Sequence, residues 1–208
     1  MKTKYKILLA LFAAVLLIFC MIQCFYAHAR YGFSREVAEA EKHLRQNVVA
    51  AAEKWLDTRE GSQKHSQILH IYNSHLPLAQ DYPVKPEDNW CAAFASAVAI
   101  ECNLTDIIPT ECGCERQTYL WKELGRWQEK DTYLPLPGDY IYYAWDEKNT
   151  WGDCAGWSDH VGIVVGTAGP FIKVIEGNKD DTVTYRKISR FDPQIRGYGL
   201  PDYGSKNP

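Results

Sequence analysis

The sequence predicts an α+β domain in which the helices come first along the chain and the strands follow. In the first part, apolar residues recur at steps of three and four, which is the period of an amphipathic helix. After Pro137, short runs rich in β-branched and aromatic residues alternate with turn residues, a pattern typical of strands. The 208 residues, 46% hydrophobic and 13% aromatic, suffice for one domain with a substantial core and an additional segment.

The N-terminal segment, residues 1–29, has the pattern of an export signal. Three lysines precede an almost unbroken apolar stretch over residues 7–22, and an A-x-A ending favours cleavage after Ala29. The apolar stretch also approaches the length that spans a bilayer, so the segment is either a signal peptide or an N-terminal membrane anchor. Because the lysines precede it, we expect the rest of the chain to be extracytoplasmic, either secreted or anchored to the outer face of the cytoplasmic membrane.

The charge of the exported part differs from that of the whole chain. The net charge is −3, but residues 1–30 hold four of the 23 basic residues and none of the 26 acidic ones. The remainder therefore carries 19 basic and 26 acidic residues, a net charge of −7. A mildly acidic domain without a basic stripe argues against nucleic acid as a partner.

Four helices are expected before the strands. Ser34 can cap the first, whose apolar positions continue to about Arg59, where Gly61 and Ser62 end it. A loop with three prolines separates the second helix from the third, and an irregular, cysteine-bearing link separates the third from the fourth. The expected helices are residues 34–59, 66–75, 90–102 and 117–129.

Four strands are expected after Pro137, at residues 139–145, 160–166, 171–177 and 182–188. The second and third form a hairpin, since Thr167 to Pro170 make a turn. Burying Val161, Ile163, Val165, Phe171 and Ile175 requires odd positions to share one face of the hairpin, with Lys173 as the single polar exception. Even positions share the other face, which places His160 beside Glu176 or Asn178.

Cys91 lies where the third helix is expected to begin. Asn89 or Asp88 can cap this helix, and unpaired backbone N–H groups in its first turn favour a thiolate. The helix is apolar nearly all the way round, with Ser96 the one polar interruption, so it should be central and buried. A cysteine here could simply fill the core. The histidine with a carboxylate or amide in register on the hairpin favours a nucleophile, base and orienting group instead.

Seven cysteines are present, and five follow the export segment: Cys91, Cys102, Cys112, Cys114 and Cys154. In an oxidising compartment an odd count leaves one thiol free, and the other four can pair in three ways. We therefore expect structural disulfides, although a reducing habitat would leave all five as thiols. No metal-ligand spacing accompanies Cys112 and Cys114, so no metal is expected.

Five short motifs together resemble those of the CHAP amidohydrolase/peptidases of bacterial cell-wall turnover, within the papain-like group. The motifs are W-C-A-A-F at 90–94, P-G-D at 137–139, D-H-V-G-I-V at 159–164, I-E-G-N at 175–178 and G-Y-G-x-P-x-Y at 197–203. The resemblance implies a catalytic domain over residues 45–204, after a helical connector at 30–44. It implies a papain-like fold, with N-terminal helices packed on a small antiparallel sheet and the site in the groove between them.

Carried over by position, the resemblance implies that Cys91 is the nucleophile and His160 the base, with Glu176 and Asn178 orienting the imidazole. No cofactor is needed. Trp90 and Trp157 adjoin this set in sequence and are candidates for substrate binding.

The expected partner is peptidoglycan, cut at a peptide bond or at the amide that joins muramic acid to L-alanine. Loops 79–89 and 146–158 would shape the groove that chooses between these bonds. A non-catalytic binding module for wall peptide, or a component of a membrane-bound secretion assembly, are the alternative functions.

Overall fold

A computed structural model of the chain describes residues 14–21, 39–130, 132–145 and 156–206. The chain divides into two compact units, Met1–Lys42 and His43–Pro208. In the first unit residues 14–21 are helical, and most of the predicted export segment lies outside the described residues, as do Ser34 and Cys154. None of the helices in the described ranges is both long and apolar enough to cross a membrane.

The helices of the second unit agree with the predicted ones in number and order. They are α2 (Glu39–Glu53, which begins in the first unit), α3 (Gln63–Asn73), α4 (Cys91–Glu101) and α5 (Cys114–Glu123), with 3₁₀ turns η1 (Ala79–Asp81) and η2 (Tyr203–Lys206). The Ser62 hydroxyl caps α3 by accepting from the backbone N–H of His65 at 3.2 Å.

Two predicted helix ends were wrong. Helix α2 stops at Glu53 instead of Arg59, because the backbone N–H of Asp57 donates to the carbonyl of Val183 and so joins this segment to a strand. Helix α5 starts earlier than predicted, at Cys114, and stops at Glu123. Gly125 follows with a left-handed φ of 64°, the usual conformation just past a helix end, and the chain then enters a strand.

Within the described residues, one antiparallel sheet of six strands forms in the order β1-β6-β2-β3-β4-β5. The four predicted strands are present, and two short strands, β1 and β6, were missed. The strands are β1 (Trp127–Gln128), β2 (Tyr140–Tyr143), β3 (His160–Ala168), β4 (Phe171–Lys179), β5 (Thr182–Ser189) and β6 (Ile195–Gly199). The predicted α+β class is confirmed.

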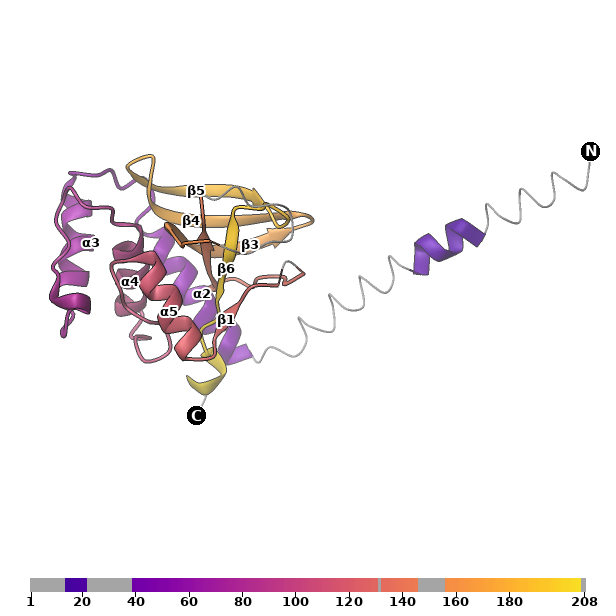
Figure 1. Cartoon of the computed structure of the whole chain (residues 1–208), viewed down its shortest axis with the longest axis horizontal. Helices are drawn as coiled ribbons and strands as arrows, with labels where there is room; N and C mark the ends of the chain where they lie inside the picture. The colour runs from indigo at the N-terminus through magenta and orange to yellow at the C-terminus, as the bar shows by residue number, and fades with distance from the viewer. Residues whose placement is uncertain (1–13, 22–38, 131, 146–155, 207–208) are drawn as a thin grey trace, which may run out of the picture. The chain divides into compact units, whose positions relative to one another are not determined.

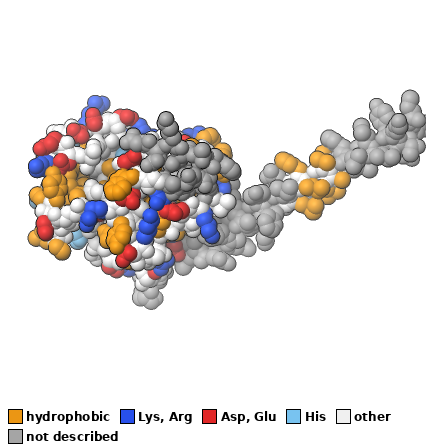
Figure 2. Space-filling model, viewed as in Figure 1, with side chains coloured by type: hydrophobic (Ala, Val, Ile, Leu, Met, Phe, Trp, Pro, Cys, Tyr) orange, Lys and Arg blue, Asp and Glu red, His pale blue; other side chains and the backbone are white. Residues whose placement is uncertain are grey.

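The helices of the second unit pack on one face of the sheet (Figure 1). Helix α4 is buried from Cys91 to Ala99 and contacts both β3 and β4. A Cβ atom on Gly177 would lie 2.5 Å from that of Phe94, so only glycine lets α4 approach β4 this closely. On the opposite face of the sheet, a second core contains residues of β2, β3, β4, β5 and β6. Figure 2 shows acidic and basic side chains interspersed with separate hydrophobic ones on the surface of this unit.

The β3–β4 hairpin has the predicted pairing near His160 and Glu176 and a different pairing near its turn. Ile163 pairs with Ile175, as a shared odd face requires. A bulge between Val164 and Gly166 then shifts the register, and Phe171 is exposed, in contrast to the prediction that it is buried.

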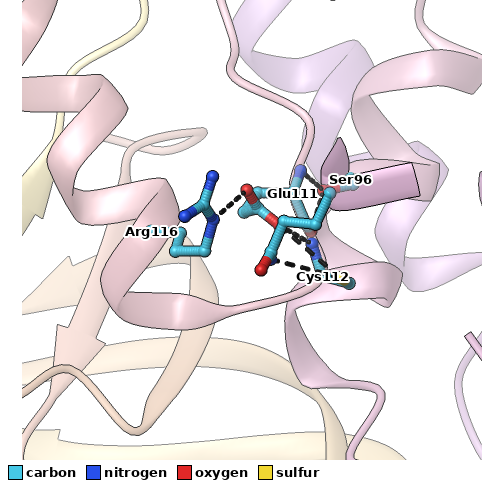
Figure 3. Close-up of polar contacts among 5 residues, drawn as sticks. Ser96, Glu111, Cys112 and Arg116 are labelled. Carbon is cyan, nitrogen blue, oxygen red and sulfur yellow. Dashed lines mark hydrogen bonds and ion pairs between the residues drawn. The ribbon is translucent and has the colours of Figure 1, made fainter. Parts of the chain in front are cut away.

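Ser96 is the one polar side chain within the buried part of α4, and it hydrogen-bonds to the backbone of Glu111 in the irregular segment between α4 and α5 (Figure 3). Its hydroxyl donates to the carbonyl of Glu111 at 2.8 Å and accepts from the N–H of Glu111 at 2.9 Å. The Glu111 carboxylate in turn accepts from the backbone N–H of Cys112 and from Arg116 on α5. These contacts fix where α5 begins relative to α4.

We predict that Ser96→Ala lowers the free energy of unfolding by about 1–3 kcal/mol, because it leaves two buried backbone groups of Glu111 without a partner. Urea unfolding followed by tryptophan fluorescence measures the change. Ser66→Ala, which removes a hydroxyl from an exposed position, is the matched control and should have little effect. Equal stability of the two variants would contradict the assigned role of Ser96.

Candidate active site

Three chemically reactive side chains meet because each stands at the first residue of its element: Cys91 on α4, Cys114 on α5 and His160 on β3. Helix α5 also hydrogen-bonds to Ser158, which lies two residues before His160. The Thr118 hydroxyl donates to the hydroxyl of Ser158 at 2.9 Å, and the backbone N–H of Ser158 donates to Glu115 at 2.7 Å. The site is thus built from two helix starts and a strand start.

The start of α4 differs from the predicted cap. The N-cap residue is Trp90, and no side chain caps the first turn. Asp88 instead accepts from the backbone N–H of Lys85 and the hydroxyl of Tyr82. The first turn is therefore left without a side-chain cap, and the backbone N–H of Ala92 hydrogen-bonds to the Cys91 sulfur.

Cys91 is buried, and its pKa lies well below the ordinary value for a thiol. The largest cause is a hydrogen bond with Cys114, whose sulfur lies 3.5 Å away. Burial opposes the shift, whereas a hydrogen bond with His160 and the positive charge of that imidazole lower the pKa further. The surroundings of Cys91 therefore favour its thiolate form beside the His160 imidazolium.

His160 is positioned on two sides. Its Nε2 atom lies 3.1 Å from Glu176 Oε2, which leaves Nδ1 as the ring nitrogen for Cys91. The Tyr143 ring stacks on the imidazole, with ring centroids 5.8 Å apart. Burial lowers the pKa of His160, but its hydrogen bonds to Cys91 and Glu176 outweigh burial and raise the pKa to about 9. The imidazole is therefore protonated near neutral pH.

Glu176 is fully buried and ionised, and it is held by a residue that the sequence analysis missed. The Nε atom of Arg186, on β5, donates to both carboxylate oxygens, at 2.7 and 2.9 Å. Burial raises the pKa of Glu176, but His160 and Arg186 bring it below the ordinary value. Gly162 leaves room for this carboxylate, because a Cβ there would lie 2.7 Å from Glu176 Cγ.

Asn178 does not join this set. A register shift lies between Glu176 and Lys179, and Asn178 adopts a left-handed φ of 56°. Its amide donates to Asn89 Oδ1 at 3.4 Å rather than to His160. The structure thus brings one of the two predicted orienting groups, Glu176, to the imidazole.

The two tryptophans proposed for substrate binding lie in opposite environments. Trp90 is fully buried, packs against His65 and Phe94, and donates its indole N–H to Glu60 at 3.0 Å. It is a core residue and presents no surface to substrate, so that expectation was wrong. Trp157 is 68% exposed and lies three residues before His160.

The cysteines are free thiols wherever the structure describes them in the second unit. Cys91, Cys102, Cys112 and Cys114 form no disulfide, in contrast to the predicted structural pairing. Among the described residues, no group of histidine, cysteine, aspartate and glutamate side chains has a geometry that could hold a metal ion.

We predict that Glu176→Gln lowers the pKa of His160 below about 9, because the carboxylate charge that favours the imidazolium is lost while burial remains. An NMR titration of the His160 ring resonances measures the shift. Glu123→Gln, on the exposed end of α5, removes a carboxylate of the same kind and should leave the titration unchanged. An unaltered His160 titration in Glu176→Gln would refute the assigned coupling.

Comparisons with family models, with curated proteins and with solved structures returned no match to this chain.

Proposed function

We propose that this chain is an extracytoplasmic cysteine hydrolase that cleaves amide bonds in bacterial peptidoglycan. The observation that carries the proposal is the continuous chain of contacts from Cys91 through His160 to Glu176. A thiolate, an imidazolium and a buried carboxylate in this order are the groups that acyl transfer requires. The cell-wall substrate and a papain-like fold are proposed from the resemblance of the motifs to the CHAP family. Export is proposed from the N-terminal segment.

In the first step, the Cys91 thiolate attacks the carbonyl carbon of the amide. The carbonyl oxygen becomes an oxyanion, and in this proposal it accepts a hydrogen bond from the backbone N–H of Cys91 at the start of α4, which no side chain caps. The positive end of the helix dipole favours the same negative charge.

In the second step, the tetrahedral intermediate collapses and the carbon–nitrogen bond breaks. His160 gives its proton to the leaving amine, which leaves an acyl group on Cys91 as a thioester. Water then attacks the thioester while neutral His160 accepts one of its protons. The products are a carboxylic acid and an amine, and the thiolate–imidazolium pair is restored.

The chemistry of the site favours an amide over a glycosidic bond. Hydrolysis of a glycosidic bond ordinarily needs two carboxyl groups on either side of the sugar. Here Glu176 is fully buried and bound by His160 and Arg186, so it is an orienting group. The candidate bonds are those of the stem and bridge peptides and the amide between muramic acid and L-alanine.

Cys91→Ala should abolish hydrolysis of purified peptidoglycan because it removes the nucleophile, and His160→Ala should reduce it by at least about a hundredfold. The release of new amines and mass spectrometry of the fragments measure both the rate and the bond. New amino termini on stem or bridge peptides indicate an endopeptidase, and free L-alanine termini with intact glycan indicate an amidase.

Cys112→Ala, at a thiol outside the catalytic set, is the control and should retain hydrolysis. Full activity of folded Cys91→Ala, or new reducing sugar ends without new amines, would refute the proposal.

The rate should fall as the pH rises through about 9, because His160 then loses the proton that the leaving amine requires. At lower pH the rate should persist until the Cys91 thiolate is protonated, and the pKa of that thiol is well below the ordinary value. A pH–rate profile under saturating substrate tests this. A rate that keeps rising above pH 9 would show that the active pair is not a thiolate and an imidazolium.

A further inference from the structure

Among the cysteines of the second unit that the structure describes, Cys114 has the sulfur nearest to that of the proposed nucleophile, Cys91. Its Sγ lies 3.5 Å from that of Cys91, at hydrogen-bonding distance, and both side chains are buried. Each cysteine is the first residue of its helix, so both backbones are fixed by the packing of α4 and α5. Amide hydrolysis as derived above uses Cys91 and His160 and assigns no chemical step to Cys114.

We propose that Cys91 and Cys114 are a dithiol site that a peroxide converts to a reversible disulfide, with Cys91 as the attacked thiol and Cys114 as the resolving one. The loss of hydrolysis that follows from this modification rests on the proposed function of Cys91. The formation of the disulfide does not.

The first step oxidises Cys91. Its thiolate attacks one oxygen of hydrogen peroxide, the oxygen–oxygen bond breaks, and Cys91 becomes a sulfenic acid with release of hydroxide. The environment favours this step, because Cys114 Sγ at 3.5 Å and the neighbouring His160 both favour the deprotonated form of the Cys91 sulfur.

The second step joins the two sulfurs. Cys114 attacks the Cys91 sulfur, the sulfur–oxygen bond breaks, and the proton of the Cys114 thiol leaves with the oxygen as water. In total the two cysteines lose two electrons, and the peroxide becomes two molecules of water once the hydroxide released in the first step has taken up a proton. The pKa of the Cys114 thiol lies well above its ordinary value, because it donates to the Cys91 thiolate and is buried. Oxidation of Cys91 removes that negative charge and with it the main reason for the raised pKa.

The geometry requires a small movement. A disulfide has a sulfur–sulfur bond of about 2.0 Å, so the two sulfurs must approach by about 1.5 Å, which side-chain rotation and a minor shift of the helix starts can supply. Hydrogen peroxide is also small enough for a site in which Cys91 is only 4% exposed.

The other described thiols of this unit face different groups. Cys112 Sγ donates to Glu111 Oε1 at 3.5 Å, and burial together with that carboxylate raises the pKa of Cys112. Cys102 Sγ donates to the carbonyl of Asn47, and burial raises its pKa to about 11. Both are therefore poor nucleophiles in their present surroundings. Among the described cysteines of this unit, only the pair at the site combines two close sulfurs with a thiol whose pKa is lowered.

The test exposes the purified full-length protein to hydrogen peroxide, blocks the remaining thiols with an alkylating agent, and maps the peptides without reduction by mass spectrometry. We expect a peptide pair linked through Cys91 and Cys114, together with loss of hydrolysis that dithiothreitol restores. In Cys114→Ser the linked pair should disappear. In this variant dimedone should trap a sulfenic acid on Cys91. Prolonged exposure to peroxide should inactivate the variant irreversibly, because no second thiol converts the sulfenic acid to a disulfide before it is oxidised further.

Cys112→Ser is the matched control: it removes the neighbouring thiol and should behave like the unmodified protein. Mapping the unmodified protein needs no variant, so it decides the matter even if Cys114→Ser fails to fold. Cys91 that stays reduced, proceeds to sulfinic acid, or links to a cysteine other than Cys114 would overturn the proposal. A Cys91–Cys114 disulfide in a protein that cuts no peptidoglycan would uphold it and count against the proposed function alone.

Discussion

The arrangement of the site depends on one constraint, the burial of α4 over all but its last two residues. This helix is enclosed from Cys91 to Ala99, and Gly177 on β4 allows it to rest directly on the sheet through Phe94. A helix with no free face cannot rotate or slide without losing packing on every side. The sulfur at its first residue is consequently fixed against His160, whose strand is packed under the same helix.

The buried carboxylate of Glu176 adds little to the stability of the fold, and what it contributes is the geometry of the site. Removing an ion from water costs several kcal/mol, and even a well-made buried ion pair returns little net stability. Here Arg186 occupies both carboxylate oxygens and His160 binds one of them. What the arrangement provides is an imidazole with one defined orientation and a raised pKa.

Much of this site follows from local sequence patterns. The apolar run after Cys91 places the thiol at the start of a buried helix, and strand parity places His160 near Glu176. Residues that depend on local irregularity were harder to place. Asn178 follows a register shift in β4, and a left-handed residue there turns its amide toward Asn89.

Two residues of the site depend on contacts between distant segments. Cys114 reaches Cys91 because the irregular link before α5 is fastened to Ser96, which no periodicity reveals. The sequence pattern places Arg186 in a strand but does not indicate that it contacts Glu176. Because it pairs with Val174, two residues before Glu176, strand parity applied to the next hairpin would have indicated its side of the sheet. Trp90 was a candidate because it adjoins Cys91 in sequence, but adjacency does not show which way a side chain points, and Trp90 packs into the core.

The hydroxyl of Ser96 has a further consequence for the dynamics of the segment between α4 and α5. Although Glu111 lies outside any helix or strand, its N–H is bonded to a side chain in the centre of the molecule. Amide hydrogen exchange at Glu111 would then require this contact with α4 to open, whereas an ordinary loop amide exchanges through local fluctuation. A stretch of irregular backbone thereby belongs to the same cooperative unit as the central helix, and the distance between the two reactive sulfurs is kept for as long as that unit stays closed.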